Sequence, residues 1–170
     1  MRVLGIDISA TATAAVAVPL DWDGRWSRVA SVVVGEKLRR DATDTERARR
    51  TETIAARVVA FARAHGATQA WVESYAFNQR TAAHTLAEVC GVLRLELVRA
   101  GIEIRTANQS AARKLLLGKL PRADVKVAVY SALRAAGATF ETFDESDAFV
   151  AANLGLAEAG GYCFAQAEAA

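Results

Sequence analysis

Apolar residues form short runs near the N-terminus and longer runs with helical spacing after residue 42. The short runs predict three strands, at Val3–Ile8, Thr11–Val18 and Val29–Gly35. The turn-forming segment Asp21–Gly24 separates the second strand from the third, and only Ser9-Ala10 link the first two. We therefore expect the chain to open as an antiparallel meander.

Helices and strands alternate through the rest of the chain. Thr43 and Glu46 form a capping box that opens a helix ending at His65-Gly66. The other predicted elements are a strand at Ala70–Val72, a helix at about 80–100, a strand at Ile102–Thr106, a helix from Asn108 or Ser110 to Leu117, a helix that Asp124 caps and that runs to Gly137, and a helix from about Phe143 to Glu158 behind a Thr142/Glu145 capping box. This order predicts an α/β fold, a mixed five-stranded sheet with helices on both faces. No linker divides the chain, so we expect one domain over residues 1–160 and a short tail over 161–170.

The second long helix carries small residues at every fourth position, Ala83, Ala87 and Gly91. Such a line lets another helix approach closely. The helix either packs only on the sheet or also contacts a second subunit, and the sequence does not choose between these arrangements.

Composition narrows the class of protein. With 170 residues and 52% hydrophobic content, the chain is long and apolar enough for a full core. Cys90 and Cys163 form no disulfide or zinc pattern, and no apolar run is long enough for a signal peptide or a membrane span. We expect a soluble cytoplasmic protein without a small-molecule cofactor. Residues 80–140 hold 10 basic and 4 acidic side chains, whereas residues 141–170 hold six acidic and no basic ones; this gradient indicates a polyanion-binding surface or only scattered surface charge.

Four acidic residues stand at unusual positions. Asp7 interrupts a buried strand, and Glu73 ends another. Alone, Asp7 would be interpreted as a turn residue at the end of its strand. Asp144 and Asp147 are neighbours on one face of the last helix, and apolar residues continue that face. The position of Glu145 is explained by the favourable interaction of an acid with the N-terminal end of the helix dipole.

Inward-facing carboxylates without a matching buried base would repel one another strongly. Divalent cations resolve this conflict, because Mg²⁺ or Mn²⁺ prefers carboxylate and water oxygens. Two such ions can activate a water and stabilise the leaving oxygen of a phosphodiester. The order and position of the four acids, rather than any one of them, predict a metal-dependent phosphodiesterase.

Three motifs carry a family resemblance. Gly5-Ile6-Asp7, Val72-Glu73-Ser74 and Asp144–Phe149 resemble the motifs of RuvC-type Holliday-junction resolvases, in the RNase H-like (integrase-like) nuclease superfamily. The resemblance covers about residues 1–157. It implies an RNase H-like mixed five-stranded sheet, a homodimer, and two-metal hydrolysis of symmetric phosphodiesters in four-way DNA junctions. It implies two Mg²⁺ ions per site, with Mn²⁺ as a substitute, held by the four metal ligands Asp7, Glu73, Asp144 and Asp147.

The sequence also departs from that pattern. Cellular members continue from Gly-Ile-Asp into Pro-Gly-Ser, whereas this chain reads Ile8-Ser9-Ala10, and the segment 74–80 is similar to the junction-contacting loop without matching it. The chain therefore looks more like a divergent phage-type member, which would act in the host cytoplasm.

Candidate DNA contacts follow from charge and aromatic side chains. In the segment after Glu73, an aromatic residue either wedges into unpaired bases at a branch point or caps the core. The residues expected to contact DNA are Tyr75, Phe77, Arg80, Arg113, Lys114, Lys119, Arg122 and Lys126. By resemblance, Arg113 or Lys114, and Lys126, match basic positions near the scissile phosphate. A second basic cluster, interpreted as part solvated face and part backbone contact, comprises Arg39, Arg40, Arg47, Arg49 and Arg50.

Other functions compete with the junction nuclease. A related RNase H-like nuclease would cut flapped DNA or structured RNA instead. An actin-like or sugar-kinase ATPase can also begin with Gly-Ile-Asp, but it needs two such domains and glycine-rich phosphate loops that this chain lacks. The intact acid set argues against a domain that only binds DNA.

Overall fold

The computed structural model describes residues 1–9, 12–35, 37–73, 83–119 and 123–165. Its five strands are β1 (Arg2–Ile8), β2 (Ala12–Pro19), β3 (Ala30–Gly35), β4 (Ala67–Glu73) and β5 (Glu103–Ala107). They form one sheet in the order β3-β2-β1-β4-β5, in which β1 to β3 pair antiparallel and β4 and β5 run parallel to β1. The predicted mixed sheet, with its opening meander, is confirmed.

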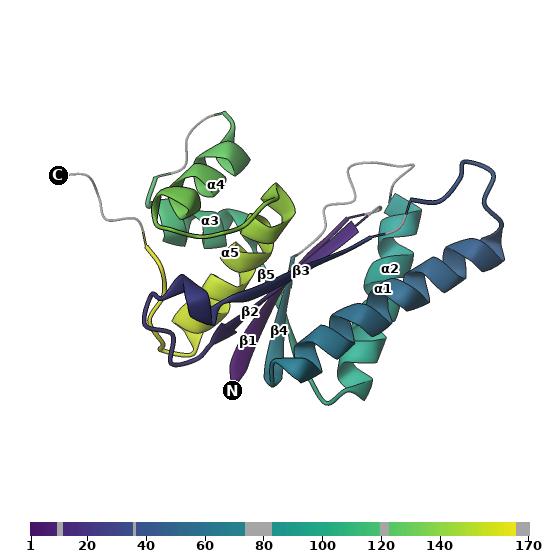
Figure 1. The fold of residues 1–170 in the computed structure, drawn as a ribbon, viewed down its shortest axis with the longest axis horizontal. Coiled ribbons are helices and arrows are strands. Elements are labelled where there is room, and N and C mark those ends of the chain that lie inside the picture. Colours follow the sequence, from purple (N-terminus) through teal and green to yellow (C-terminus); the bar gives the residue numbers. More distant parts are fainter. Residues whose placement is uncertain (10–11, 36, 74–82, 120–122, 166–170) are drawn as a thin grey trace.

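Helices cover both faces of this sheet (Figure 1). They are α1 (Asp44–Ala64), α2 (Ala83–Arg99), α3 (Gln109–Leu117), α4 (Val125–Ala135) and α5 (Phe143–Glu158), with one 3₁₀ turn, η1 (Trp26–Arg28). The first two helices lie on one face, over an apolar cluster that includes Leu4 and Ile6 of β1. The other three lie on the opposite face, over a second cluster that includes Val3. None of the described helices is long and apolar enough to cross a membrane.

The alternation of β1 decides where its acidic residue points. Successive side chains of a strand face opposite sides, and Leu4 and Ile6 belong to the cluster under α1 and α2. Val3, Gly5 and Asp7 therefore face α5. The strand is buried on both sides, as its nearly continuous apolar sequence predicts.

Gly5 lets α5 lie directly on β1. A Cβ at this position would collide with the carbonyl oxygen of Ala148, and it would lie 2.9 Å from the Cβ of Ala152. Farther along the same helix, a Cβ on Gly155 would collide with the indole ring of Trp71. The two glycines thus let α5 lie close to the sheet. Asp147 precedes Ala148, which makes the contact with Gly5.

The ends of the helices follow the sequence in most cases. Both predicted capping boxes form, at Thr43 with Glu46 and at Thr142 with Glu145. Asn108, rather than the alternative Ser110, caps α3 by accepting a hydrogen bond from the Ala111 amide. The expectation that Asp124 caps α4 is wrong: this residue has left-handed backbone angles (φ 53°, ψ 36°), and its side chain makes no capping hydrogen bond.

Gly91, one of the small residues on α2, lies on the described surface. Gly91 is exposed, and no atom lies within 4 Å of a Cβ built on it. Beside it on the same side of α2, Val92, Leu95 and Val98 are exposed apolar residues. At Gly91, therefore, packing against the described part of the chain does not explain the small residue.

An aromatic cluster closes one end of the α5 face. Trp22 and Trp26 lie against Phe149 with ring centroids 5.6 and 5.0 Å apart. Phe164 joins them: its amide and carbonyl exchange hydrogen bonds of 2.7 and 2.8 Å with Asn153, and its ring lies 5.8 Å from that of Trp26. Phe164, from the segment 161–170 that we expected to be a tail, therefore packs against this cluster.

Candidate active site

Two of the predicted acids lie side by side at one edge of the sheet. Ile6 pairs with Val72 in the parallel β1–β4 ladder, so Asp7 and Glu73 are the next residues of neighbouring strands. The sequence folds this way because each acid ends or interrupts a short apolar strand that must be buried. Ligand sites in open α/β sheets gather beyond strand ends of this kind.

The Asp7 side chain is almost completely buried, with 6% of its surface exposed. Burial raises the pKa of Asp7 to about 8, assisted by a hydrogen bond to Glu73 and by the charges of Glu73 and Asp147, while Lys126 acts in the opposite direction. Near neutral pH this carboxyl therefore retains its proton. The shift shows that the carboxyls of Asp7, Glu73 and Asp147 occupy one electrostatic neighbourhood.

Asp147 reaches this neighbourhood from α5 and is 1% exposed. Its Oδ1 accepts hydrogen bonds from Nε and Nη2 of Arg113, at 3.2 and 2.8 Å, and its Oδ2 lies 2.7 Å from Nζ of Lys126. Gln109 Nε2 also donates to the Asp147 carbonyl at 3.3 Å. Helices α3 and α4 thus hold the acid in place through both of its oxygens and its backbone.

These ion pairs correct one expectation. We expected acids without a matching base, but Asp147 has two basic partners, Arg113 and Lys126, which precede it by 34 and 21 residues. The Arg113 side chain is 16% exposed and that of Lys126 is 53% exposed. Burial opposes the charge of Lys126, but the hydrogen bond and charge of Asp147 outweigh it, and the pKa of Lys126 is raised.

Asp144 stands apart from the other three acids. It lies in the first turn of α5, is half-buried, and is not among the main groups that shift the pKa of Asp7. Among the residues that the structure describes, no three acidic, histidine or cysteine side chains are arranged to hold a metal ion. Asp7, Glu73 and Asp147 interact electrostatically without forming such an arrangement, and Asp144 lies one helical turn from Asp147.

The expected DNA contacts divide into three groups. Arg113 and Lys126 lie at Asp147, as two of the basic positions assigned by resemblance. Lys114 and Lys119 are exposed; Lys114 lines an open groove of about 670 Å³ between α3 and α5 rather than the acid site. The remaining four, Tyr75, Phe77, Arg80 and Arg122, lie outside the described residues.

Sequence reasoning missed three residues that shape the site. Gly5 was quoted only as part of a motif, yet it sets the distance between β1 and α5. Gln109 holds the backbone of Asp147, and nothing in its sequence context signals this. Ser31 donates a 2.7 Å hydrogen bond to Glu145, which anchors the first turn of α5 to β3.

Comparison with solved structures identifies the fold. The chain is similar to Thermus thermophilus RuvC in complex with Holliday junction substrate, with a TM-score of 0.70 and 20% identity over 94% of this chain and 96% of that one. A second Thermus thermophilus RuvC structure gives a TM-score of 0.67 at 20% identity, over 95% and 98% of the two chains. This chain has the RuvC fold.

A more distant structure agrees with that result. The yeast mitochondrial Holliday junction resolvase Ydc2 is similar with a TM-score of 0.53 and 11% identity, over 89% of this chain and 77% of that one. No family model and no curated protein matches the sequence. The predicted RNase H-like fold is confirmed, whereas the phage-type assignment stays a prediction.

Proposed function

We propose that this protein is a metal-dependent nuclease that resolves four-way DNA junctions by paired, symmetric phosphodiester hydrolysis. The observation that carries the proposal is the meeting of Asp7, Glu73 and Asp147 at one edge of a sheet with the RuvC fold. A RuvC of the same fold was solved with Holliday junction substrate, which makes this DNA the first substrate to test. Flapped DNA and structured RNA are the alternatives that the same experiment examines.

The donor set fits a hard divalent cation such as Mg²⁺. Asp7, Glu73 and Asp147 offer only carboxylate oxygens, which is the chemistry that Mg²⁺ and Mn²⁺ prefer. Burial, and after it the hydrogen bond to Glu73 and the charges of Glu73 and Asp147, raise the pKa of Asp7, so a cation bound here would favour its ionised form. These three residues would hold the metal, and Asp144 would complete the set if the first turn of α5 turned it inward.

When bound, two such ions supply an activated water and stabilise the leaving oxygen. The protein prepares the site in three ways. Asp7 would release its proton to solvent, Lys126 would leave Oδ2 of Asp147, and Arg113 would keep Oδ1 in place. Once released, the Lys126 ammonium is free to pair with a phosphate oxygen of the strand to be cut.

Paired incision requires two active sites, and we propose a homodimer through α2. The exposed residues Glu88, Val92, Leu95 and Arg99 follow one side of that helix. In an antiparallel pair of α2 helices related by a twofold axis, Val92 meets Leu95 of the second copy and Glu88 meets its Arg99. An isologous interface of this kind places two opposite-charge pairs around an apolar centre.

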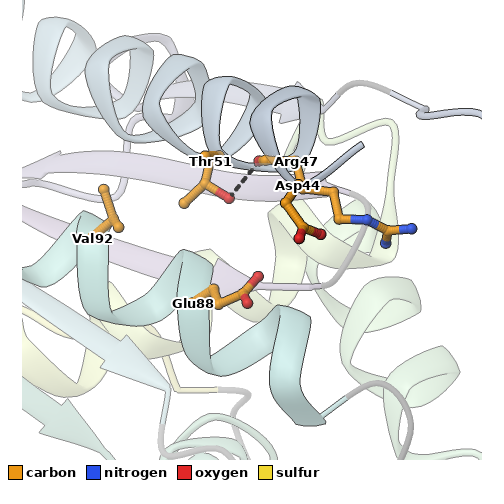
Figure 2. Close-up of a pocket in the computed structure, with 6 residues that line it drawn as sticks. Asp44, Arg47, Thr51, Glu88 and Val92 are labelled. Carbon is orange, nitrogen blue, oxygen red and sulfur yellow. Dashed lines mark hydrogen bonds between the residues drawn. The ribbon is translucent and has the colours of Figure 1, made fainter. Parts of the chain in front are cut away.

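A hollow beside this stripe gives a second copy room to dock. It has a volume of about 240 Å³ between α1 and α2, and Asp44, Arg47, Thr51, Glu88 and Val92 line it with Ala48 (Figure 2). The Asp44 and Glu88 carboxylates face the hollow from the two helices, while the Arg47 guanidinium points away from it. A basic side chain of the second copy, such as Arg99, is complementary to that rim.

The decisive experiment compares substrates and metals. Labelled four-way junction, flapped DNA, duplex and RNA are incubated with the protein, with and without Mg²⁺ or Mn²⁺. We expect symmetric nicks in the junction only, and only with metal. Cleavage restricted to flaps or RNA would assign the site to another substrate.

Two variants test the site itself. Asp7→Asn and Asp147→Asn should abolish cleavage and retain junction binding, whereas Asp41→Asn, an exposed loop carboxylate, should cut like the wild type. Circular dichroism checks that Asp147→Asn still folds, because it leaves two basic partners without a counter-charge. Wild-type cutting by both acid variants would refute the assignment of the site.

The dimer is tested by charge reversal. Glu88→Arg and Arg99→Glu should each weaken self-association in sedimentation experiments, and the double variant should restore it. A wild-type chain that sediments as a monomer at micromolar concentration would contradict paired incision without contradicting single-strand nicking.

A further inference from the structure

A second, strongly basic pocket lies outside the carboxylate site. It has a volume of about 350 Å³, between the segment after β3, the first half of α1 and the start of α2. Five basic residues line it together with Leu38 and Thr85: Lys37, Arg39, Arg40, Arg47 and Arg50. No acidic residue is among its described lining. A concave surface with this charge attracts anions.

Arg50 makes this pocket more than a patch of surface charge. Its side chain is buried, with only 7% of the residue exposed, and its Nε has no hydrogen-bond partner. A buried guanidinium that leaves a donor unpaired is costly, because it has lost water without gaining an acceptor. A ligand that brings oxygen acceptors into the pocket would remove this cost.

The other basic residues of the pocket differ in whether they already have a partner within the protein. Arg47 donates from Nε to the Ala42 carbonyl at 3.2 Å, and Arg39 lies 3.5 Å from Glu46, so these two help to hold the wall of the pocket. Lys37 and Arg40 are exposed and form no ion pair with any described side chain. With Arg50, they make three cations of the pocket for which no described side chain supplies a counter-ion.

The pocket lies at the same edge of the sheet as the carboxylates. Gly35, the last residue of β3, pairs with Ala12 of β2, next to the pairing of Thr13 with Ile8 at the end of β1. The lining residue Thr85 belongs to the first turn of α2, which follows β4 and its terminal Glu73. The pocket is lined from α1 and α2 and lies on their side of this edge, whereas Asp7 faces the α5 side because it alternates with Leu4 and Ile6 along β1.

We propose that this pocket binds a phosphate group of the DNA strand that crosses the sheet edge on its way to the carboxylates. Arginine matches a phosphate because its planar fork donates two parallel hydrogen bonds to it. Such a contact positions the DNA without reading its sequence. The inference rests on the proposed nuclease function, and it adds a binding site away from the scissile bond.

The test measures binding apart from cleavage. In EDTA, which prevents cutting, fluorescence anisotropy gives the dissociation constant of a labelled four-way junction at several salt concentrations. We expect Arg40→Gln to raise this constant at least about threefold, equally for different junction sequences, and to lower the salt slope by about one. Arg50→Lys keeps the charge and loses the planar fork, so it should raise the constant by a similar factor and leave the slope unchanged. Arg57→Gln, the same loss of charge on the exposed side of α1 outside the pocket, is the matched control and should change neither quantity by more than the error.

Two further measurements separate the explanations. Urea unfolding of Arg50→Lys shows whether a weaker complex reflects unfolding, and Arg40→Gln replaces an exposed residue that carries no fold contact of this kind. Titration with inorganic phosphate, followed by thermal shift, tests for a free-anion site. Weaker DNA binding in the two pocket variants, with or without a change in phosphate binding, supports the inference. Unchanged DNA binding overturns it, even if phosphate binding is lost. Junction cleavage by the wild type is scored separately, so its absence would refute the proposed function and not the pocket.

Discussion

Replacing Gly5 with alanine should separate the strand that carries Asp7 from the helix that carries Asp147. The added Cβ would collide with the carbonyl oxygen of Ala148 and stand 2.9 Å from the Cβ of Ala152. The first of these atoms belongs to the backbone of a buried helix, so no side-chain rotation can remove the collision. Either β1 or α5 must move.

The size of the effect follows from that geometry. Overpacking a core by one methyl group costs roughly 1–3 kcal/mol when side chains can adjust. Here the obstacle is backbone, and α5 is buried along most of its length. We therefore expect Gly5→Ala to lower the free energy of unfolding by about 3 kcal/mol, the upper end of that range. Because Ala148 follows Asp147, any relaxation also displaces that carboxylate from Asp7.

Urea unfolding measures this change, and Gly91→Ala provides the matched control. Gly91 lies in exposed helix, and a Cβ there meets no atom of the described chain within 4 Å. The same substitution should then raise the free energy of unfolding by about 0.5–1 kcal/mol through helix propensity. If Gly5→Ala stayed within about 0.5 kcal/mol of the wild type, the close contact between β1 and α5 would be refuted.

Four further predictions concern charge, metal binding and capping. The folded state raises the pKa of Asp7 from 3.8 to about 8, so its contribution to stability is complete below pH 4 and is lost as the pH rises toward 8. In metal-free urea titrations, the free energy of unfolding should therefore fall over this pH range, and Asp7→Asn should remove that fall. For the same reason, calorimetry should show that Mg²⁺ binds more tightly as the pH rises and releases protons, and constant affinity from pH 6 to 9 would count against a site at Asp7. Lys126→Met should tighten Mg²⁺ binding severalfold, because no ammonium then competes for Asp147 Oδ2, whereas Lys119→Met should not. Thr142→Ala should cost about 1 kcal/mol in thermal unfolding by removing the cap of α5, and an unchanged midpoint would show that the cap is dispensable.

Local signals in the sequence predicted most of the framework. Apolar runs located all five strands to within about three residues at each end, and both capping boxes form where Thr43 and Thr142 placed them. These features depend on neighbours within four residues, so the sequence shows them directly. Asp124 failed as a cap because its backbone adopts a left-handed turn, which cap propensity alone does not report.

The surroundings of the acids depended on contacts that are distant in sequence. Asp7 and Glu73 could be predicted as neighbours because they end strands of one parallel pair. The pairing of Arg113 and Lys126 with Asp147 requires α3 and α4 to cross over α5, and no local pattern encodes that crossing. Asp144 shares a helix face with Asp147, but its position in the first turn leaves it half-buried.

The unequal exposure of the two partners of Asp147 explains how one carboxylate can be both fixed and available. A carboxylate that is 1% exposed needs compensation for lost hydration whether or not a metal is present. Arg113 supplies it from a nearly buried position with two hydrogen bonds to Oδ1, so its departure would leave a buried charge unpaired. Lys126 reaches Oδ2 from a side chain that is half in solvent, and its ammonium can return to water at little cost. If the proposed metal binds here, Oδ2 is the oxygen that Asp147 would offer it, and Arg113 would keep the carboxylate oriented as Lys126 leaves.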